Sequence, residues 1–114
     1  MSQEPSRAAI GVRFDLIPGD ALIEVAKVFS KGAAVHGDNN WRKARLKGDK
    51  GPINHAAKHL ANYQAGIPDD DGPDRNIHLS HAIVNLMFEL HYNLHPEVYG
   101  EPEVQGGIPP IHRD

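Results

Sequence analysis

A polar stripe runs along the segment IHLSHAIVNLMFELH, residues 77–91, where His78, His81, Asn85 and Glu89 stand at offsets of 0, 3, 7 and 11. At about 100° per residue, a helix places these four side chains within roughly one third of its circumference. The remaining positions are almost all apolar. Because burying an imidazole or carboxylate without partners costs about 1–3 kcal/mol per group, the polar stripe should be paired, wet or bound to a ligand. A narrow solvent-facing stripe is the alternative.

Two further groups of side chains could complete a metal site with this stripe. His55 and His59 lie one helical turn apart in the preceding segment. An acidic loop then carries Asp69, Asp70, Asp71 and Asp74. Carboxylate and imidazole together suit Mg²⁺, Mn²⁺ or Zn²⁺, and a divalent ion can hold a polyphosphate and activate water. We predict metal ligands at His59, Asp71, His78 and His81; a solvated turn with surface histidines is the alternative.

Two other stretches have the composition of a nucleotide-binding surface. The sequence VRFDLIP sets Arg13 and Asp15 among apolar residues, and GDNNWRK contains Asn40 and the single tryptophan, Trp41. An aromatic ring beside amide and cationic groups can stack a base and bind phosphate. A packed loop, with Trp41 as a hydrophobic plug, fits the same residues equally well.

Three helical segments should position these residues, so the fold class is all-α. Apolar spacing predicts helices over 20–36, from Pro52 to the residue before Gly66, and over 77–94. A loop of about 14 residues joins the first two helices. In the second helix the apolar stripe is Ile53, Ala56, Ala57, Leu60 and Ala61. His55 and His59 project away from that stripe, so we do not expect them in the core.

The domain organisation follows from the same pattern. Residues 1–12 read as a flexible N-terminal tail, 13–95 as a helical nucleotide-binding domain and 96–114 as an extended Pro/Gly-rich C-terminal arm. A chain of 114 residues is one domain and offers a small core. Because apolar residues cover about two thirds of helix 77–94, we predict a homo-oligomer with this helix in its interface.

Composition excludes several classes of function. The net charge of −3 gives no uniform positive field for duplex nucleic acid. The absence of cysteine excludes disulfides and thiolate metal sites. With neither a signal peptide nor a membrane-length apolar run, we expect no membrane partner and a cytoplasmic location.

The order of the motifs RFDLIP, HGDNNW, KHL, an acidic loop and HLSHAIVNL resembles the phage and bacterial dATP/dGTP diphosphohydrolase N-terminal-domain family. The resemblance covers about residues 13–94. It implies a small helical protein that uses a divalent metal to split a purine deoxynucleoside triphosphate into monophosphate and pyrophosphate. Residues on matching positions are Asp15, Asn40, Trp41, His59, His78, His81 and Asn85. Three positions depart from the family pattern: Val35 replaces a lysine, His36 a tyrosine and Lys58 an arginine.

The leading hypothesis is therefore a metal-dependent nucleoside triphosphate pyrophosphohydrolase acting on dATP or dGTP. Its catalytic residues would be His78 and Asp70, with one of them as general base. The nucleotide would contact Arg13, Asp15, Asn40, Trp41, Lys58 and Asn85, and the cofactor would be Mg²⁺ or Mn²⁺, with Zn²⁺ as an alternative. The rival hypothesis is a non-catalytic phage protein that captures a signalling nucleotide in a pocket between subunits. A third reading is a structural helical assembly with an inter-subunit histidine network.

Overall fold

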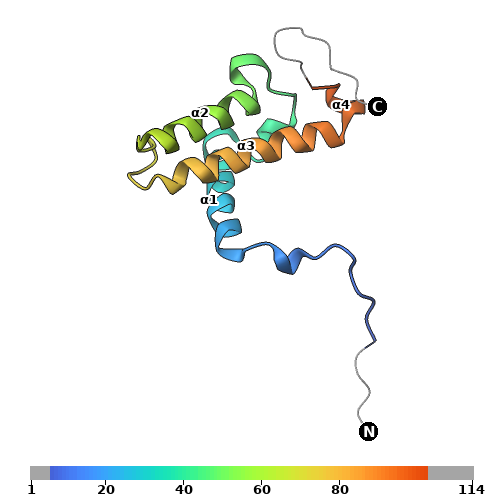
Figure 1. The fold of residues 1–114 in the computed structure, drawn as a ribbon. Helices are drawn as coiled ribbons and strands as arrows, with labels where there is room; N and C mark the ends of the chain where they lie inside the picture. Colours follow the sequence, from blue (N-terminus) through green and yellow to red (C-terminus); the bar gives the residue numbers. More distant parts are fainter. Residues whose placement is uncertain (1–5, 103–114) are drawn as a thin grey trace, which may run out of the picture.

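The computed structural model describes residues 6–102, which form an all-α structure without a β-strand (Figure 1). The three long helices are α1 (Gly19–His36), α2 (Pro52–Ala65) and α3 (Asn76–Leu94). The short elements are η1 (Phe14–Leu16), η2 (Asn40–Arg42), η3 (Gly48–Lys50) and α4 (Pro96–Tyr99). The predicted fold class, all-α with three main helices, is confirmed. Among the described helices, none has the length and apolarity needed to cross a membrane.

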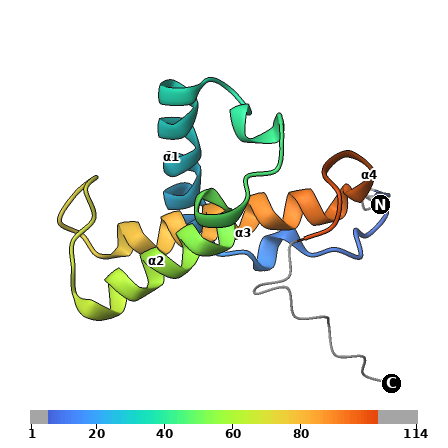
Figure 2. The same ribbon diagram turned by 90° about the horizontal axis from the view of Figure 1, so that it is seen from above.

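Helices α2 and α3 lie side by side and antiparallel, and α1 crosses the pair (Figure 2). The reversal between them begins at Gly66, whose φ of 75° is a left-handed value that glycine adopts without strain. The amides of Gly66 and Ile67 donate to the carbonyls of Tyr63 and Asn62, which closes the end of α2. This tight end returns the acidic loop toward the facing sides of α2 and α3.

The apolar stripe expected to be the core face of α2 is mostly exposed. Ala56 is buried, but Ile53 and Leu60 are not, and the position buried next to Ala56 is His59. The expectation that His59 avoids the core is therefore wrong. The physical reason is that polar partners on α3 and the acidic loop satisfy the His59 ring, so its burial leaves no unpaired group.

Helix α3 has two faces of opposite character. The polar stripe turns toward α2 and the acidic loop, and His78 is almost completely buried there. We name the opposite side the outer face of α3; it consists of Ile83, Leu86, Met87 and Leu90. These four side chains are 41–59% exposed.

The segment between α1 and α2 is held to the far end of α3. The buried Tyr92 donates its hydroxyl hydrogen bond to the Trp41 carbonyl at 2.7 Å, and Tyr99 donates to the Arg42 carbonyl at 2.6 Å. The Arg45 guanidinium pairs with Glu89, the last residue of the polar stripe, at 3.2 Å. The long loop is thus fixed against α3 although it contains only short 3-10 turns.

The two ends of the described chain differ. Residues 96–99, expected in an extended arm, form the short helix α4, and Arg45 donates to the carbonyl of the following Gly100 at 3.0 Å. Residues 103–114 of the expected C-terminal arm lie outside the described residues, as do residues 1–5 of the expected N-terminal tail. Residues 6–18 run away from the three helices (Figure 1).

Candidate metal centre and nucleotide pocket

Three side chains from α2, the acidic loop and α3 converge in the interior. The Nδ1 atoms of His59 and His78 are 3.0 Å apart. Asp69 Oδ1 lies 3.6 Å from His59 Nδ1 and 3.4 Å from His78 Nδ1. The side chains of His59, Asp69 and His78 are only 8%, 10% and 2% exposed. We call these three residues the triad.

The hydrogen bonds of the triad indicate where the ring hydrogens lie when both imidazoles are neutral. The Ile67 carbonyl can only accept, so His78 Nε2 carries the hydrogen and donates to it at 2.8 Å. In the neutral ring, His78 Nδ1 is then an acceptor, and His59 Nδ1 donates to it. Burial lowers the pKa of His59 to about 4, with the His81 and Lys58 charges acting in the same direction. His59 is therefore neutral at neutral pH, and its Nδ1 can coordinate a metal in the tautomer that carries the hydrogen on Nε2 instead.

The spacing of the triad matches the requirements of a metal ion. Ligand bonds of about 2.0–2.1 Å in a tetrahedral arrangement place the ligand atoms about 3.3–3.4 Å apart. The three observed separations of 3.0, 3.4 and 3.6 Å bracket this value. The carbonyl that holds His78 Nε2 plays the part of an outer-shell partner, which orients a ligating imidazole. The residues of the triad thus fit a divalent metal.

A second group of side chains shares Asp69 with the triad. Asp69 Oδ2 is 3.8 Å from His81 Nε2, and Asp71 Oδ2 is 3.0 Å from the same nitrogen. Lys31 on α1 forms an ion pair with the other oxygen of Asp71. The hydrogen bond from Lys31, followed by that from His81, holds the pKa of the Asp71 carboxyl below its usual value. Asp71 therefore stays ionised between two donors.

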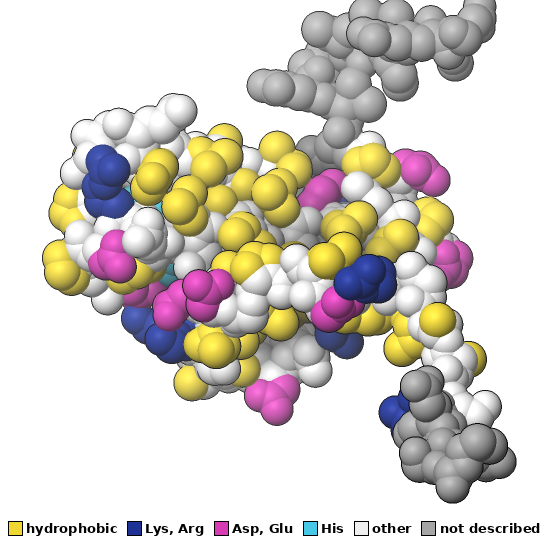
Figure 3. Space-filling model, turned by 60° about the horizontal axis from the view of Figure 1, so that its bottom comes forward, with side chains coloured by type: hydrophobic (Ala, Val, Ile, Leu, Met, Phe, Trp, Pro, Cys, Tyr) yellow, Lys and Arg dark blue, Asp and Glu magenta, His cyan; other side chains and the backbone are white. Residues whose placement is uncertain are grey.

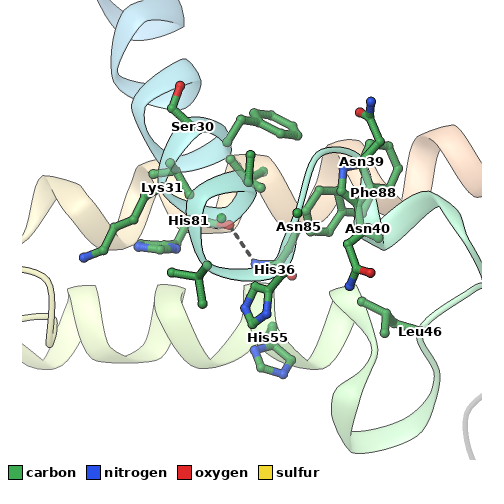
Figure 4. A pocket seen from close by; sticks show the side chains of 18 of the residues that line it. Ser30, Lys31, His36, Asn39, Asn40, Leu46, His55, His81, Asn85 and Phe88 are labelled. Atoms are coloured by element: carbon green, nitrogen blue, oxygen red, sulfur yellow. Dashed lines mark hydrogen bonds between the residues drawn. The ribbon is translucent and has the colours of Figure 1, made fainter.

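A cavity of about 710 Å³ opens beside this second group. Its volume is in the range of small-molecule and cofactor sites. The aromatic rings of Phe29, Trp41 and Phe88 form one part of its lining, and Trp41 stacks on Phe88 at 4.4 Å between ring centroids. Lys31 and His81 reach into the opposite end, from α1 and α3 (Figure 4). The cavity thus joins an aromatic wall to a charged end next to the triad.

Amide side chains also line the cavity: Asn85 lies between the two ends, and Asn39 and Asn40 lie beside Phe88 (Figure 4). Asn85 donates from Nδ2 to the His81 carbonyl at 2.9 Å. Asn39 adopts a left-handed backbone conformation with φ of 55°, which asparagine tolerates better than most residues. This conformation starts the turn η2 and presents Asn40 and Trp41 to the cavity.

The structure brings together most of the residues that the sequence singles out. Those lining the cavity are Asn40, Trp41, His59, Asp71, His81 and Asn85, while His78 lies buried behind them. Four others do not line it: Arg13 and Asp15 pair with each other on the exposed segment around η1, Lys58 is exposed on α2, and Asp70 lies in the acidic loop. Asp70 belongs to neither metal-competent group.

Sequence reasoning did not single out Asp69 from its neighbours, and it missed Lys31. The turn decides which carboxylate faces inward: the amide of Asp71 donates to Asp69 Oδ2 at 3.0 Å, and this fixes the Asp69 side chain. No pattern in the sequence signals that choice. Lys31 comes from a helix 40 positions earlier in the chain, so only the tertiary structure reveals its contact with Asp71.

Comparison with known proteins identifies a family. The family model described as dATP/dGTP diphosphohydrolase, N-terminal, matches residues 3–101. Neither the curated proteins nor the solved structures contain a match. The family description supports, at a coarse level, a hydrolase whose substrate is a nucleotide. Because the match spans most of the chain, this protein belongs to the dATP/dGTP diphosphohydrolase N-terminal family.

Proposed function

We propose that this chain is a metal-dependent pyrophosphohydrolase that converts dATP or dGTP to the monophosphate and pyrophosphate. The observation that carries the proposal is the adjacency of an aromatic wall and a metal-competent triad around one cavity of nucleotide size. The purine would stack near Trp41, and the phosphates would extend toward His81 and Asp71. Asn40 and Asn85 would then hydrogen-bond the nucleotide.

The donor set of the triad bears on the identity of the ion. Two imidazoles and one carboxylate suit Zn²⁺ or Fe²⁺ better than Mg²⁺, which prefers oxygen ligands. A divalent ion held by His59, Asp69 and His78 would neutralise phosphate charge and polarise the phosphorus–oxygen bonds. The triad is buried on the edge of the cavity, so it excludes bulk water from that side.

The reaction requires a proton acceptor for the attacking water. Water adds to the α-phosphorus, the bond to the β-phosphate bridging oxygen breaks, and one proton is released. Both nitrogens of His78 are engaged, with Nε2 on the Ile67 carbonyl, which favours a ligand role over the basic role expected from sequence. His81 has its Nε2 on Asp71, so in the neutral ring Nδ1 can take the proton while Asp71 orients the imidazole.

We also propose that the functional unit is a homo-oligomer. The outer face of α3 exposes Ile83, Leu86, Met87 and Leu90, and Figure 3 shows hydrophobic side chains spread over much of one side of the molecule. Several large, exposed apolar side chains grouped on one helix face are typical of a surface that binds another protein. A second copy of the chain covering this face with its own would bury both surfaces at once.

The test is hydrolysis by the purified chain. dATP and dGTP are incubated with Mg²⁺, Mn²⁺ or Zn²⁺, and chromatography detects monophosphate and pyrophosphate. We expect both products, their loss on chelation, and their loss in D69N but not in D70N. D70N is the matched control because Asp70 lies in the same loop outside both groups of possible ligands.

Three outcomes are distinguished by this design. An active D69N would remove the metal role of the triad. An inactive D70N that retains metal would make Asp70 the catalytic carboxylate. Tight nucleotide binding by the wild type without products, under all three ions, would favour the non-catalytic nucleotide-binding hypothesis.

A further inference from the structure

We propose that Lys31 binds the phosphate chain of the nucleotide, by exchanging its ion pair with Asp71 for a pair with phosphate oxygens. This inference rests on the proposed function, because it assigns a role within the same pocket. It adds a residue that neither the motifs nor the family description singles out.

The position of Lys31 is the first support. It projects from α1 into the charged end of the cavity, near His81 from α3 (Figure 4). Its ammonium bridges to Asp71, whose second oxygen contacts His81. An anion bound beside His81 would therefore lie within reach of the flexible Lys31 side chain without any movement of a helix.

The second support is the small number of cationic side chains around the cavity. Among the described residues that line it, the two lysines are Lys31 and Lys50. Of these, Lys31 is the one with an ion pair to the group next to the triad. The nucleotide triphosphate carries several negative charges, and Asp71 adds another at the same end. A cation there is needed to offset their repulsion.

Breaking the Lys31–Asp71 ion pair should cost little free energy. The Lys31 side chain is 60% exposed and that of Asp71 30%, so their pair is largely screened by water and contributes little to the stability of the fold. Lysine is a compact point charge on a flexible stem, which suits it to a partner that changes. A multiply charged phosphate next to the same ammonium is a stronger partner than one carboxylate.

The same helix offers a way to move the charge without changing its sign. Val35 lies one helical turn after Lys31, also lines the cavity and is exposed, so a lysine there would fit without disturbing packing. Lys27 provides a control one turn in the other direction, since it pairs with Glu24 and does not line the cavity.

The experiment compares the affinities of deoxyadenosine, dAMP and dATP, and of the matching guanine compounds, for wild type, K31A, K31A/V35K and K27A, by calorimetry with the metal that supports binding. The α,β-methylene analogue, whose bridge cannot be hydrolysed, stands for each triphosphate. In K31A we expect dATP to bind about tenfold more weakly, as for a lost charge-assisted hydrogen bond, and deoxyadenosine to bind as before. K31A/V35K should recover part of the dATP affinity, and K27A should match the wild type. Thermal unfolding should be the same in all four proteins.

The possible failures are separable. If the wild type binds dATP and K31A shows the same increase in affinity from deoxyadenosine to dATP, the role of Lys31 is overturned while the pocket stands. If the wild type binds neither the three adenine compounds nor the matching guanine compounds, the proposed function fails and the role of Lys31 fails with it.

Discussion

In a typical small soluble domain a helix buries its apolar face and exposes its polar face. Helix α3 does the reverse along its polar stripe and its outer face. The inward face carries His78, His81 and Asn85, whereas the outer face carries exposed Ile83 and Leu86. Helix α2 repeats the pattern, because it buries His59 and exposes Leu60. Polar partners, rather than apolar contact alone, therefore hold the facing sides of the two helices together.

The two faces therefore have different roles. Polar groups in the interior are tolerated only when they are satisfied, and among the described residues no buried side-chain polar atom lacks a hydrogen-bond partner. The inward face is therefore a group of hydrogen-bonded polar side chains beside a cavity. Within the described residues 6–102 the outer face stays 41–59% exposed, and the hydrophobic effect favours covering it.

Charge on the outer face should produce the largest effect. We expect the double variant L86D/L90D to dissociate the oligomer, because two carboxylates cannot be buried in an apolar interface without partners. Light scattering should then report about 12.5 kDa, the mass of one chain, in place of a multiple of it. The control V98D introduces a charge at an exposed apolar residue on α4, away from this face. A wild-type protein that already runs as a monomer would contradict the proposal.

Arg45→Ala should give the next largest effect, on stability. Its guanidinium, only 4% exposed, pairs with Glu89 and also donates to Asn93 and to the carbonyls of Tyr99 and Gly100. Removing one partner of a buried ion pair costs about 3 kcal/mol, since the remaining charge is left unpaired. Urea unfolding measures this loss, with K43A as the exposed control.

The same variant also tests whether the two ends of the polar stripe act independently. The carboxylate of Glu89 is paired with Arg45, whereas His78 and His81 contact carboxylates of the acidic loop. Metal binding by R45A, measured under conditions where it remains folded, should therefore match that of the wild type. A selective loss of metal affinity in R45A would show that the two ends of the stripe are not independent.

How far the sequence could predict this arrangement depends on the kind of interaction. Helix limits follow from local chemistry: Pro52 begins α2 and Gly66 closes it, as predicted. The direction in which α2 faces does not, because a helical wheel assumes that the apolar side is buried within the same chain. The exposed Ile53 and Leu60 violate that assumption.

The candidate site shows the same boundary between local and tertiary information. The one-turn spacing of His78 and His81 and their likeness to a metal-ligand pattern were readable from the sequence. The choice of Asp69 for the triad depends on a turn within the loop, and the contact of Lys31 with Asp71 depends on the packing of α1. Neither is encoded in a short motif.

Two alanine substitutions on the inward face should separate structural from ligand-binding histidines. His78 is 1% exposed and bonded at both nitrogens, so H78A should cost about 2 kcal/mol of stability and abolish metal binding. His81 is more exposed, and H81A should change stability by less than about 1 kcal/mol while weakening nucleotide binding. Thermal unfolding and calorimetry measure the two effects. An H81A protein that melts much earlier but binds nucleotide normally would make the polar stripe a scaffold.

The smallest expected effect concerns the aromatic wall, where the inward face turns from polar to apolar. Trp41 stacks on Phe88 and meets Tyr92 edge to face, so it already has packing partners within the fold. If it also contacts the purine, its fluorescence should change on addition of dATP, and the signal is specific because the chain has one tryptophan. W41F keeps an aromatic ring of smaller area, so it should weaken dATP binding only several-fold. This corresponds to about 1 kcal/mol, the low end of the free energies measured for stacking a base on an aromatic side chain. Calorimetric binding without any fluorescence response would restrict Trp41 to packing, and the base would then have to lie elsewhere along the cavity.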